Sequence, residues 1–260
     1  MSPRLHHAIQ AALSAGRSTL AHYQTGVGLE LKGDLSPVTI ADKNAEESIR
    51  QYLGGHFPGE TILGEEQGLT GASDDRWVVD PIDGTKSFVT GVPLYATLLA
   101  YEQAGQPILG VCYFPALNEL FYAEQGGGAF WNGRPIQATT ETDLRKLIIA
   151  HAGLNGLLKY NRLRGLEHLS SLTMGTRTWC DAYGHMLVAS GRAAAMIDPV
   201  VSRWDVSALL PILSEAGAVA STFAGRSPLE PAHANGSLEL ISAAPLHHRT
   251  MLEAFGEDPS

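Results

Sequence analysis

The sequence of 260 residues predicts a fold of the mixed α and β class. Stretches with the 3.6-residue spacing of helices alternate with short apolar runs typical of strands, and turn residues separate them. The composition, 44% hydrophobic and 17% charged, is that of a globular protein. No window approaches the ~20 apolar residues that a membrane span needs.

The N-terminal elements are predicted from spacing and capping residues. Apolar residues at near-helical spacing predict an amphipathic helix over residues 4–24. A strand and a loop follow, and Thr39 can cap a second helix over residues 40–54, which would end at the pair "GG". Two short strands come next: "ETILGEE" runs into a loop, and "RWVVD" ends at Asp80.

The middle of the chain is predicted to be mainly β. Apolar runs over residues 94–124 are interrupted by turn residues. The stretch "GGGAFWNGRPI" adds a hairpin, with Asn132 and Gly133 in a type I′ turn.

The second half is predicted to alternate between strands and helices. Its elements are the strand "KLIIAH", a helix over residues 178–190, the strand "AAAMID", a helix over residues 206–216, and strands over residues 218–223 and 238–243. A polar linker near residues 137–146 is a soft boundary. We therefore expect an N-terminal lobe over residues 1–140 and a C-terminal lobe over residues 141–260, which together form one continuous unit.

Charge and cysteine content limit the partners and the compartment. The net charge of −9, with no stripe of lysine and arginine, argues against nucleic acid. An acidic protein that binds an anionic substrate needs local positive charge, which a bound divalent cation would supply. Cys112 and Cys180 are too few for a disulfide framework, and the first residues lack the apolar core of a signal peptide. We therefore expect a cytoplasmic protein.

Two carboxylates three residues apart, Asp80 and Asp83, stand in the stretch "WVVDPIDGTKSF". One interpretation is a tight surface turn, because proline and Asp-Gly are favoured in turns for backbone reasons. The other is an assembled site, because a strand delivers both acids at its carboxyl end, where open α/β sheets bind ligands. Taken alone, the stretch fits either interpretation.

Further acids stand in comparable positions. Glu65 and Glu66 follow a predicted strand, where a solvated loop is the alternative explanation. Asp205, in "SRWDVSALLPILSEAGA", stands where a helix N-cap belongs, and Asp is a standard N-cap residue. Considered together, these acids offer the oxygen ligands that Mg²⁺ prefers. Two metal ions about 3.5–4 Å apart can clamp the attacking and leaving oxygens of a phosphoryl displacement.

Several stretches resemble the motifs of a known family. In order and rough spacing, "GEE", "WVVDPIDGTKSF" and "WDVSALLPILSEAGA" resemble the three signatures of the inositol monophosphatase family, and "GGGAFWNGRPI" resembles its hairpin. The resemblance implies the layered αβαβα sugar-phosphatase fold. It also implies hydrolysis of a small phosphate monoester by metal-activated water, with two or three Mg²⁺ ions, no covalent phosphoenzyme and a homodimer.

The resemblance further implies a role for each site residue. By position, the metal ligands would be Glu65, Asp80, the carbonyl oxygen of Ile82, Asp83 and Asp205. Glu65 and Thr85 would orient and activate water, and Asp42 would support Thr85. The backbone amides of Gly84 and Thr85 would receive phosphate oxygens, as helix N-termini do.

The residues after "DGT" bear on the substrate. The run "KSF" is more similar to the histidinol-phosphatase branch than to the inositol-phosphate branch, which typically reads Asp-Gly-Thr-x-Asn-Phe. We therefore expect L-histidinol phosphate, hydrolysed to L-histidinol in histidine biosynthesis. Inositol 1-phosphate and a 3′(2′),5′-bisphosphate nucleotide are the alternatives.

Two more acids are candidates for contact with a cationic substrate such as histidinol phosphate. Asp198 matches the position of the family's acceptor for a substrate hydroxyl, and Asp181 lies in the segment that faces the leaving group. Asp198 could equally be a turn acid before proline, and Asp181 a helix acid favoured by the helix dipole. Arg177 and Arg203 could bind a second anionic group on the substrate. A nucleotide therefore stays an alternative substrate.

Overall fold

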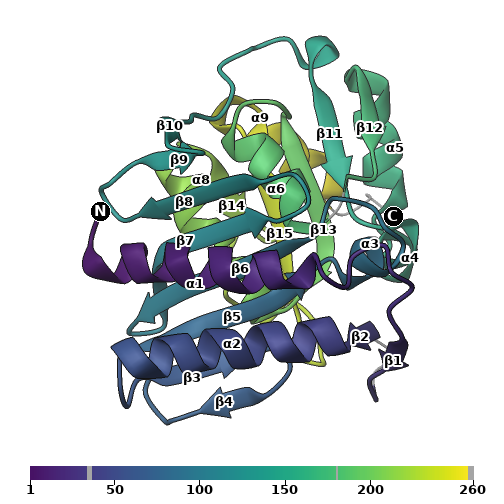
Figure 1. The fold of residues 1–260 in the computed structure, drawn as a ribbon. Coiled ribbons are helices and arrows are strands. Elements are labelled where there is room, and N and C mark those ends of the chain that lie inside the picture. Colours follow the sequence, from purple (N-terminus) through teal and green to yellow (C-terminus); the bar gives the residue numbers. More distant parts are fainter. Residues whose placement is uncertain (34–36, 180, 257–260) are drawn as a thin grey trace.

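The computed structural model describes residues 1–33, 37–179 and 181–256 of the chain. Within them the strands form two main sheets and a two-stranded ribbon (Figure 1). The large sheet contains β3 (Thr61–Gly64), β4 (Gly68–Thr70), β5 (Arg76–Asp83), β6 (Ala96–Gln103), β7 (Gln106–Phe114), β8 (Glu119–Glu124), β9 (Ala129–Trp131) and β10 (Arg134–Pro135). The small sheet contains β11 (Ile148–His151), β12 (Gly175–Arg177), β13 (Ala195–Val201), β14 (Val219–Ser221) and β15 (Leu238–Ala243). The ribbon pairs β1 (Leu29–Leu31) with β2 (Pro37–Thr39).

The order of the strands places β5 well inside the large sheet. That order is β10-β9-β8-β7-β6-β5-β3-β4, and its neighbours are antiparallel except for the parallel pair β3 and β5. The small sheet has the order β12-β11-β13-β15-β14. Because β3 and β5 run in the same direction, their carboxyl ends meet at the same edge of the large sheet.

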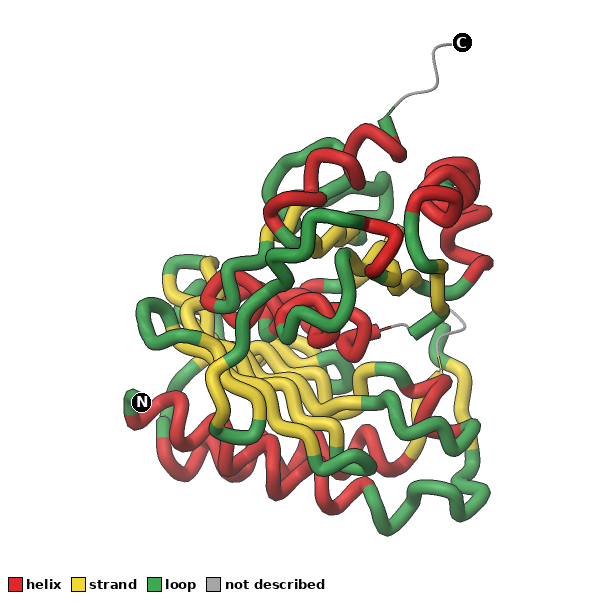
Figure 2. Tube along the Cα trace, turned by 90° about the horizontal axis from the view of Figure 1, so that it is seen from above, coloured by secondary structure: helices red, strands yellow, loops and turns green. Residues whose placement is uncertain are grey.

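The helices lie in three layers around the two sheets, as Figure 2 shows from above. The outer face of the large sheet is covered by α1 (Pro3–Thr19) and α2 (Ile40–His56). Between the sheets lie α6 (Asp181–Ala189) and α8 (Leu209–Glu215). The outer face of the small sheet is covered by α4 (Leu154–Lys159), α5 (Leu163–Leu172) and α9 (Pro245–Phe255). The layered αβαβα architecture is thereby confirmed; the short elements α3 (Thr85–Val89), α7 (Arg203–Ser207) and a 3₁₀ turn (Leu144–Lys146) complete it.

A core shared by both halves of the chain fills the space between the sheets. It joins Phe114 and Phe121 of the large sheet to Met186 of α6, Ile212 of α8 and Leu240 of β15. A second core packs α1 and α2 against the large sheet, and a third packs α5 and α9 against the small sheet. The sheets are therefore held together by continuous apolar packing.

Two predicted helices end elsewhere in the structure. The helix predicted over residues 4–24 ends at Thr19, and the next residue, Leu20, is exposed and not part of a buried core. The helix predicted over residues 40–54 begins at its predicted cap, Thr39, but runs through both glycines to His56. The ring of His56 stacks on that of Tyr52 one turn earlier, which extends the helix.

The helix predicted over residues 206–216 is two helices that meet at Ala208. Pro211 explains the break, because it has no N–H to donate to the carbonyl of Ser207, and it is tolerated in the first turn of the new helix α8. The N-cap of α7 is Ser202, so the prediction that Asp205 is the cap was wrong. Asp205 stands in the first turn, where its Oδ2 accepts the backbone N–H of Ser202 at 2.7 Å.

Other local predictions are confirmed. Asn132 and Gly133 have φ angles of 49° and 77°, as a type I′ hairpin turn requires. Cys112 is a buried free thiol, and Cys180 lies outside the described residues.

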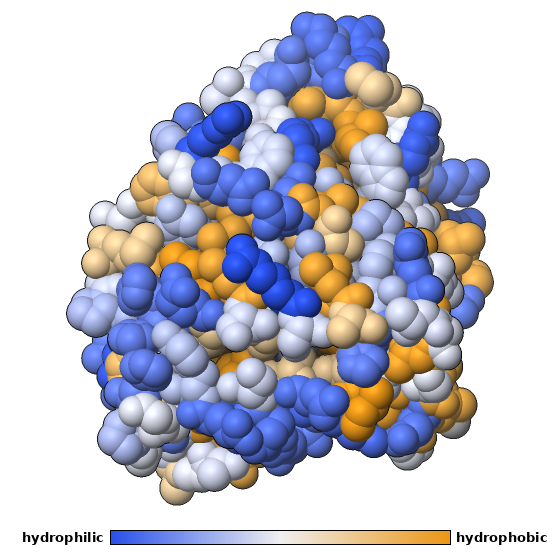
Figure 3. Space-filling view, in the orientation of Figure 1, coloured by the Kyte–Doolittle hydropathy of each residue, from blue (hydrophilic) through white to orange (hydrophobic). Residues whose placement is uncertain are grey.

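Hydrophilic and hydrophobic residues are interspersed on the face seen in Figure 3. No helix in the described ranges is both long and apolar enough to cross a bilayer.

Candidate metal and phosphate site

The carboxyl ends of β3 and β5 bring the predicted acids together. Glu65 directly follows β3, and its backbone N–H donates to the carbonyl of Val79 on β5 at 3.1 Å. Asp80 and Asp83 occupy the last part of β5. Acids from two neighbouring parallel strands thus reach one edge of the sheet, where the sequence predicted a site.

A β-bulge in β5 turns Asp80 and Asp83 to the same side. Asp80 pairs with Leu98 and Asp83 with Ala96. Between these paired positions β5 therefore has two residues where β6 has one. In a regular strand, residues three apart point to opposite faces, whereas one extra residue restores the same face. Pro81 therefore lies inside the strand and not in a turn after it, which corrects the expected end of the strand at Asp80.

The bulge is held by two hydrogen bonds to its own backbone. The hydroxyl of Thr97 on β6 donates to the carbonyl of Pro81 at 2.9 Å. The carboxylate of Asp80 accepts the backbone N–H of Ile82 at 3.1 Å. All four residues are buried. The direction of the two acids is therefore fixed by the sheet.

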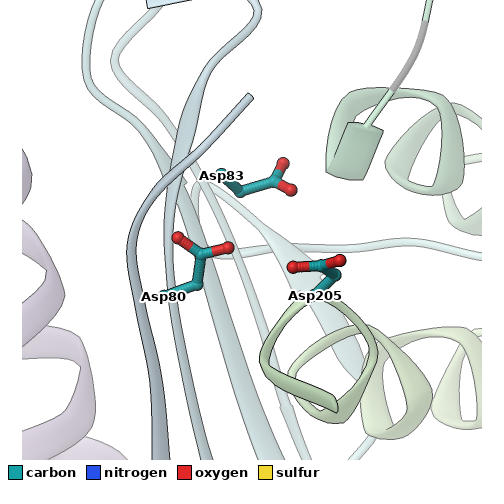
Figure 4. A group of neighbouring side chains, drawn as sticks. All are labelled: Asp80, Asp83 and Asp205. Carbon is teal, nitrogen blue, oxygen red and sulfur yellow. The ribbon is translucent and has the colours of Figure 1, made fainter. Parts of the chain in front are cut away.

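Asp205 completes a cluster of three carboxylates that could hold a metal ion. One oxygen from each of Asp80, Asp83 and Asp205 lies within 4.8 Å of the others. Figure 4 shows Asp80 and Asp83 on the strand and Asp205 on the neighbouring helix, with their carboxylates around a common space. The cluster thus takes ligands from both halves of the chain.

The electrostatics of the cluster favour a bound cation. Burial raises the pKa of Asp80 well above its ordinary value, and the charges of Glu65 and Asp83 add to the effect. Burial likewise raises the pKa of Asp83, with Asp181 adding to it, and raises the pKa of Asp205 to about 7. Several buried carboxylates without a counter-charge are costly unless they bind protons or metal. Oxygen donors of this kind fit Mg²⁺.

Glu65 and Glu66 contact a residue that the sequence did not reveal. The Lys32 ammonium lies 2.8 Å from Glu65 Oε1 and 2.7 Å from Glu66 Oε1. Lys32 lies 33 residues before Glu65, just after the short strand β1. No local pattern connects the two, so only the folded chain shows the contact.

The predicted pair of Thr85 and Asp42 is also brought together. The Thr85 hydroxyl lies 3.4 Å from Asp42 Oδ1 and 3.1 Å from the carbonyl oxygen of Ile82. Asp42 is fully buried in the first turn of α2, where its Oδ2 accepts both the N–H and the hydroxyl of Thr39. Burial raises the pKa of Asp42, although the Thr39 hydrogen bonds oppose this.

Gly84 begins the short helix α3 in a conformation that favours glycine. Its φ is 76°, and a Cβ there would lie 2.9 Å from Asp181 Oδ2. The carboxylate of Asp181 is therefore close to Gly84. The next residue, Ala182, donates its N–H to Asp83 Oδ2 at 2.9 Å, which ties α6 to the cluster.

These residues line one small cavity of about 170 Å³. Its walls are formed by Pro37, Glu65, Asp80, Ile82, Asp83, Gly84, Thr85, Lys86, Asp181 and Asp205. A larger hollow of about 540 Å³ near the end of α8 presents only one carboxylate, that of Glu215. The predicted metal and phosphate residues thus share a wall with Asp181 and Lys86.

Asp198 is not among the residues that line this cavity. It is buried on β13, where burial raises its pKa well above the ordinary value and the charges of Asp181 and Asp205 add to the effect. Arg177 and Arg203 were the candidates for binding a second anionic group on the substrate. The guanidinium of Arg203 donates to Glu102 at 2.9 Å and to the carbonyl of Gly105 at 2.6 Å. Arg177 is exposed on β12.

Comparisons with known proteins agree with this geometry. The pattern of the inositol monophosphatase family matches residues 1–258. A histidinol-phosphatase from Chlorobaculum parvum is 39% identical over 258 residues, which cover 98% of each chain. An inositol-1-monophosphatase from Mesorhizobium japonicum is 36% identical and covers 86% of this chain and 87% of its own.

A solved structure supports the same assignment. The extragenic suppressor protein SuhB from Bartonella henselae superposes with a TM-score of 0.89 at 29% identity, over 98% of this chain and 99% of that chain. Members of the family are metal-dependent phosphoric monoester hydrolases. Because the match in sequence and fold extends over nearly the whole chain, this protein belongs to the inositol monophosphatase family and is a phosphatase.

Proposed function

We propose that the protein is a Mg²⁺-dependent phosphatase that hydrolyses L-histidinol phosphate to L-histidinol. The observation that carries the metal dependence is the cluster of the buried Asp80 and Asp83 with the half-buried Asp205, in which one oxygen of each carboxylate lies within 4.8 Å of the others. The residues that would hold the ions are these three, Glu65 and the carbonyl oxygen of Ile82. Bound divalent cations would lower the pKa of a coordinated water and offset the charge of the phosphoryl group.

The remaining residues would position water and phosphate. Glu65 and Thr85 approach the same cavity, so their side chains can accept and orient a water beside the phosphorus atom. Asp42 would hold the Thr85 hydroxyl from behind. The amides of Gly84 and Thr85 would donate to phosphate oxygens, and the exposed ammonium of Lys86 stands at the rim of the same cavity.

The choice of histidinol phosphate is supported by charge. Histidinol carries an ammonium group, and an acid beside the phosphate site would stabilise it. Asp181 lines the cavity, and its charge adds to the burial that raises the pKa of Asp198. The relatives named histidinol-phosphatase, at 36–39% identity, point the same way.

Two alternatives remain in view. The inositol-1-monophosphatase at 36% identity favours inositol 1-phosphate as the second candidate. A bisphosphate nucleotide is less favoured, because the guanidinium of Arg203 is already paired with the buried Glu102. The homodimer and the cytoplasmic location stay predictions.

A substrate panel tests the proposal. Phosphate release from histidinol phosphate, inositol 1-phosphate, adenosine 3′,5′-bisphosphate and fructose 1,6-bisphosphate is measured with Mg²⁺ and with EDTA. We expect the highest kcat/KM for histidinol phosphate and no release in EDTA. A higher kcat/KM for another substrate would refute the histidinol assignment, and activity in EDTA would refute the metal assignment.

A further inference from the structure

We propose that Glu46 is a positioning residue that holds Glu65 in the geometry needed to bind metal. The inference rests on the proposed function, because Glu65 is one of the proposed metal ligands. Glu46 lies on α2, 19 residues before Glu65, and has no exposed surface. It lies outside the cavity, so it would act only through the loop that carries Glu65.

The Glu46 carboxylate is bound to the backbone of that loop. Its Oε2 accepts the N–H of Glu66 at 2.7 Å, and its Oε1 accepts the N–H of Gln67 at 3.0 Å. A Cβ on Gly64 would overlap the carboxylate, so only glycine allows this close approach. The two residues after Glu65 and the one before it are therefore fixed by a single side chain.

Arg50 extends the same support to the far end of the loop. Its Nε lies 2.8 Å from Glu46 Oε1, which offsets the buried charge. Its Nη2 donates to the carbonyl of Gly68 at 2.6 Å, and its Nη1 donates to the Thr70 hydroxyl at 3.0 Å. Glu46 and Arg50 together span the connection from β3 to β4.

One face of α2 thus supports both residues proposed to orient water. Asp42, Glu46 and Arg50 are four residues apart, and residues at this spacing lie on one side of a helix. Asp42 contacts Thr85, and Glu46 and Arg50 hold the loop of Glu65. A buried ion pair that serves only stability is often replaceable, as a whole pair, by apolar residues without loss. The fit of the Glu46 carboxylate to two loop amides assigns Glu46 to positioning.

The test compares Glu46→Gln with Glu47→Gln in the full chain. The amide of Gln has a single acceptor oxygen. If that oxygen keeps Arg50 Nε and the N–H of Gln67, the NH2 group of Gln faces the N–H of Glu66, so one of the two loop amides loses its acceptor. Glu47 is the neighbouring exposed residue, whose carboxylate accepts the side-chain amides of Gln51 and Gln67 and, within the described residues, no backbone N–H of the loop. It is therefore a control for the same chemical change on the same helix.

We expect two effects of Glu46→Gln that Glu47→Gln lacks. In metal-free protein, hydrogen exchange at the amides of Glu66 and Gln67 becomes faster. Calorimetric titration shows Mg²⁺ affinity lowered by about 10–100-fold, the usual cost of removing a group that orients a ligand. A destabilised core variant, Leu53→Ala, controls for stability and keeps the wild-type Mg²⁺ affinity.

Two results separate this inference from the proposed function. If the wild type binds Mg²⁺ and releases phosphate while Glu46→Gln has unchanged Mg²⁺ affinity, Glu46 is not a positioning residue, whatever happens to its stability. A loss of affinity in Leu53→Ala equal to that in Glu46→Gln would have the same meaning. If the wild type itself neither binds Mg²⁺ nor releases phosphate, the proposed function is wrong.

Discussion

The strands β5 and β13 contain the same device, one in each sheet. Asp80-Pro81 in β5 and Asp198-Pro199 in β13 are each followed by a shift in register against the antiparallel neighbour. In both strands, two residues lie between the paired positions where the neighbouring antiparallel strand has one. In both, the carbonyl of the proline also accepts a hydrogen bond from a side chain, from Thr97 at 2.9 Å and from His233 at 2.8 Å.

The two bulges differ in the residue that follows. In β5 the third residue after the first acid is Asp83, so the bulge turns two carboxylates to one side. In β13 the corresponding residue is the buried Val201, so a single acid, Asp198, results. The same backbone irregularity therefore gives a candidate metal cluster in one sheet and a lone buried acid in the other, and the side chain after the bulge decides which.

The strongest test of this difference is Asp83→Asn against Asp198→Asn. Removing the second β5 carboxylate should lower kcat/KM by about 10³-fold or more, because metal coordination contributes several kcal/mol to catalysis. Asp198→Asn should leave Mg²⁺ affinity at the wild-type value. Steady-state kinetics with a Mg²⁺ titration measure both, and equal losses in the two variants would contradict the distinction.

The pH dependence of stability should distinguish metal-free from metal-bound protein. The folded pKa of Asp205 is about 7, above its unfolded value, so folded protein retains a proton that unfolded protein has lost between these pH values. The contribution of Asp205 to folding stability is therefore present at low pH and is lost as the pH rises through about 7. In EDTA we expect unfolding to become easier by about 2 kcal/mol from pH 5 to pH 8.

Thermal unfolding provides the measurement. The expected loss lowers Tm by about 4–8 °C in EDTA, and Mg²⁺ should abolish it by replacing protons in the cluster. A Tm in EDTA that rises from pH 5 to pH 8 would show that the acids are not crowded in the way described.

The proposed role of Asp198 on β13 is tested with substrates that differ in charge. Asp198→Asn should raise KM for histidinol phosphate by about tenfold, since one close charge pair is worth roughly 1.4 kcal/mol or more. KM for inositol 1-phosphate, which is neutral apart from its phosphate, should change by less than about twofold. Equal changes for the two substrates would remove the charge argument.

The smallest expected effects come from the side chains that hold the bulges. Thr97→Val removes the donor to Pro81 and should weaken Mg²⁺ binding about fivefold, the worth of one hydrogen bond. His233→Phe removes the donor to Pro199 but keeps an aromatic ring against Tyr160. It should affect KM for histidinol phosphate and leave Mg²⁺ binding unchanged. Isothermal calorimetry measures Mg²⁺ binding by both variants. Weaker Mg²⁺ binding in His233→Phe but not in Thr97→Val would contradict the comparison of the two bulges.

Much of the candidate site could be predicted from local sequence. Asp80, Asp83 and Glu65 stand directly at strand ends, and a resemblance of motifs placed Asp205 and Thr85 with them. The bulge could not be predicted, because a proline after an acid is equally compatible with a turn. Only pairing with β6 shows that the strand continues to Asp83.

The supporting residues were beyond reach for a different reason. Lys32, Glu46 and Glu102 each make contacts with residues that are distant in sequence, and no spacing pattern records such pairs. Helix ends were misjudged where packing or a missing donor overruled local preference, as at Leu20 and Pro211. The division into lobes of residues 1–140 and 141–260 stays a prediction, since the core between the sheets draws on both.

That shared core has a consequence for proteolysis. Between β10 and β11 the chain passes through a connection in which Arg145 and Lys146 are exposed, so trypsin can reach both. A cut there would sever the backbone but leave the apolar contacts of Phe114 and Phe121 with the second half intact. The two fragments should therefore migrate together under native conditions and separate only when denatured, as a nicked but still assembled molecule.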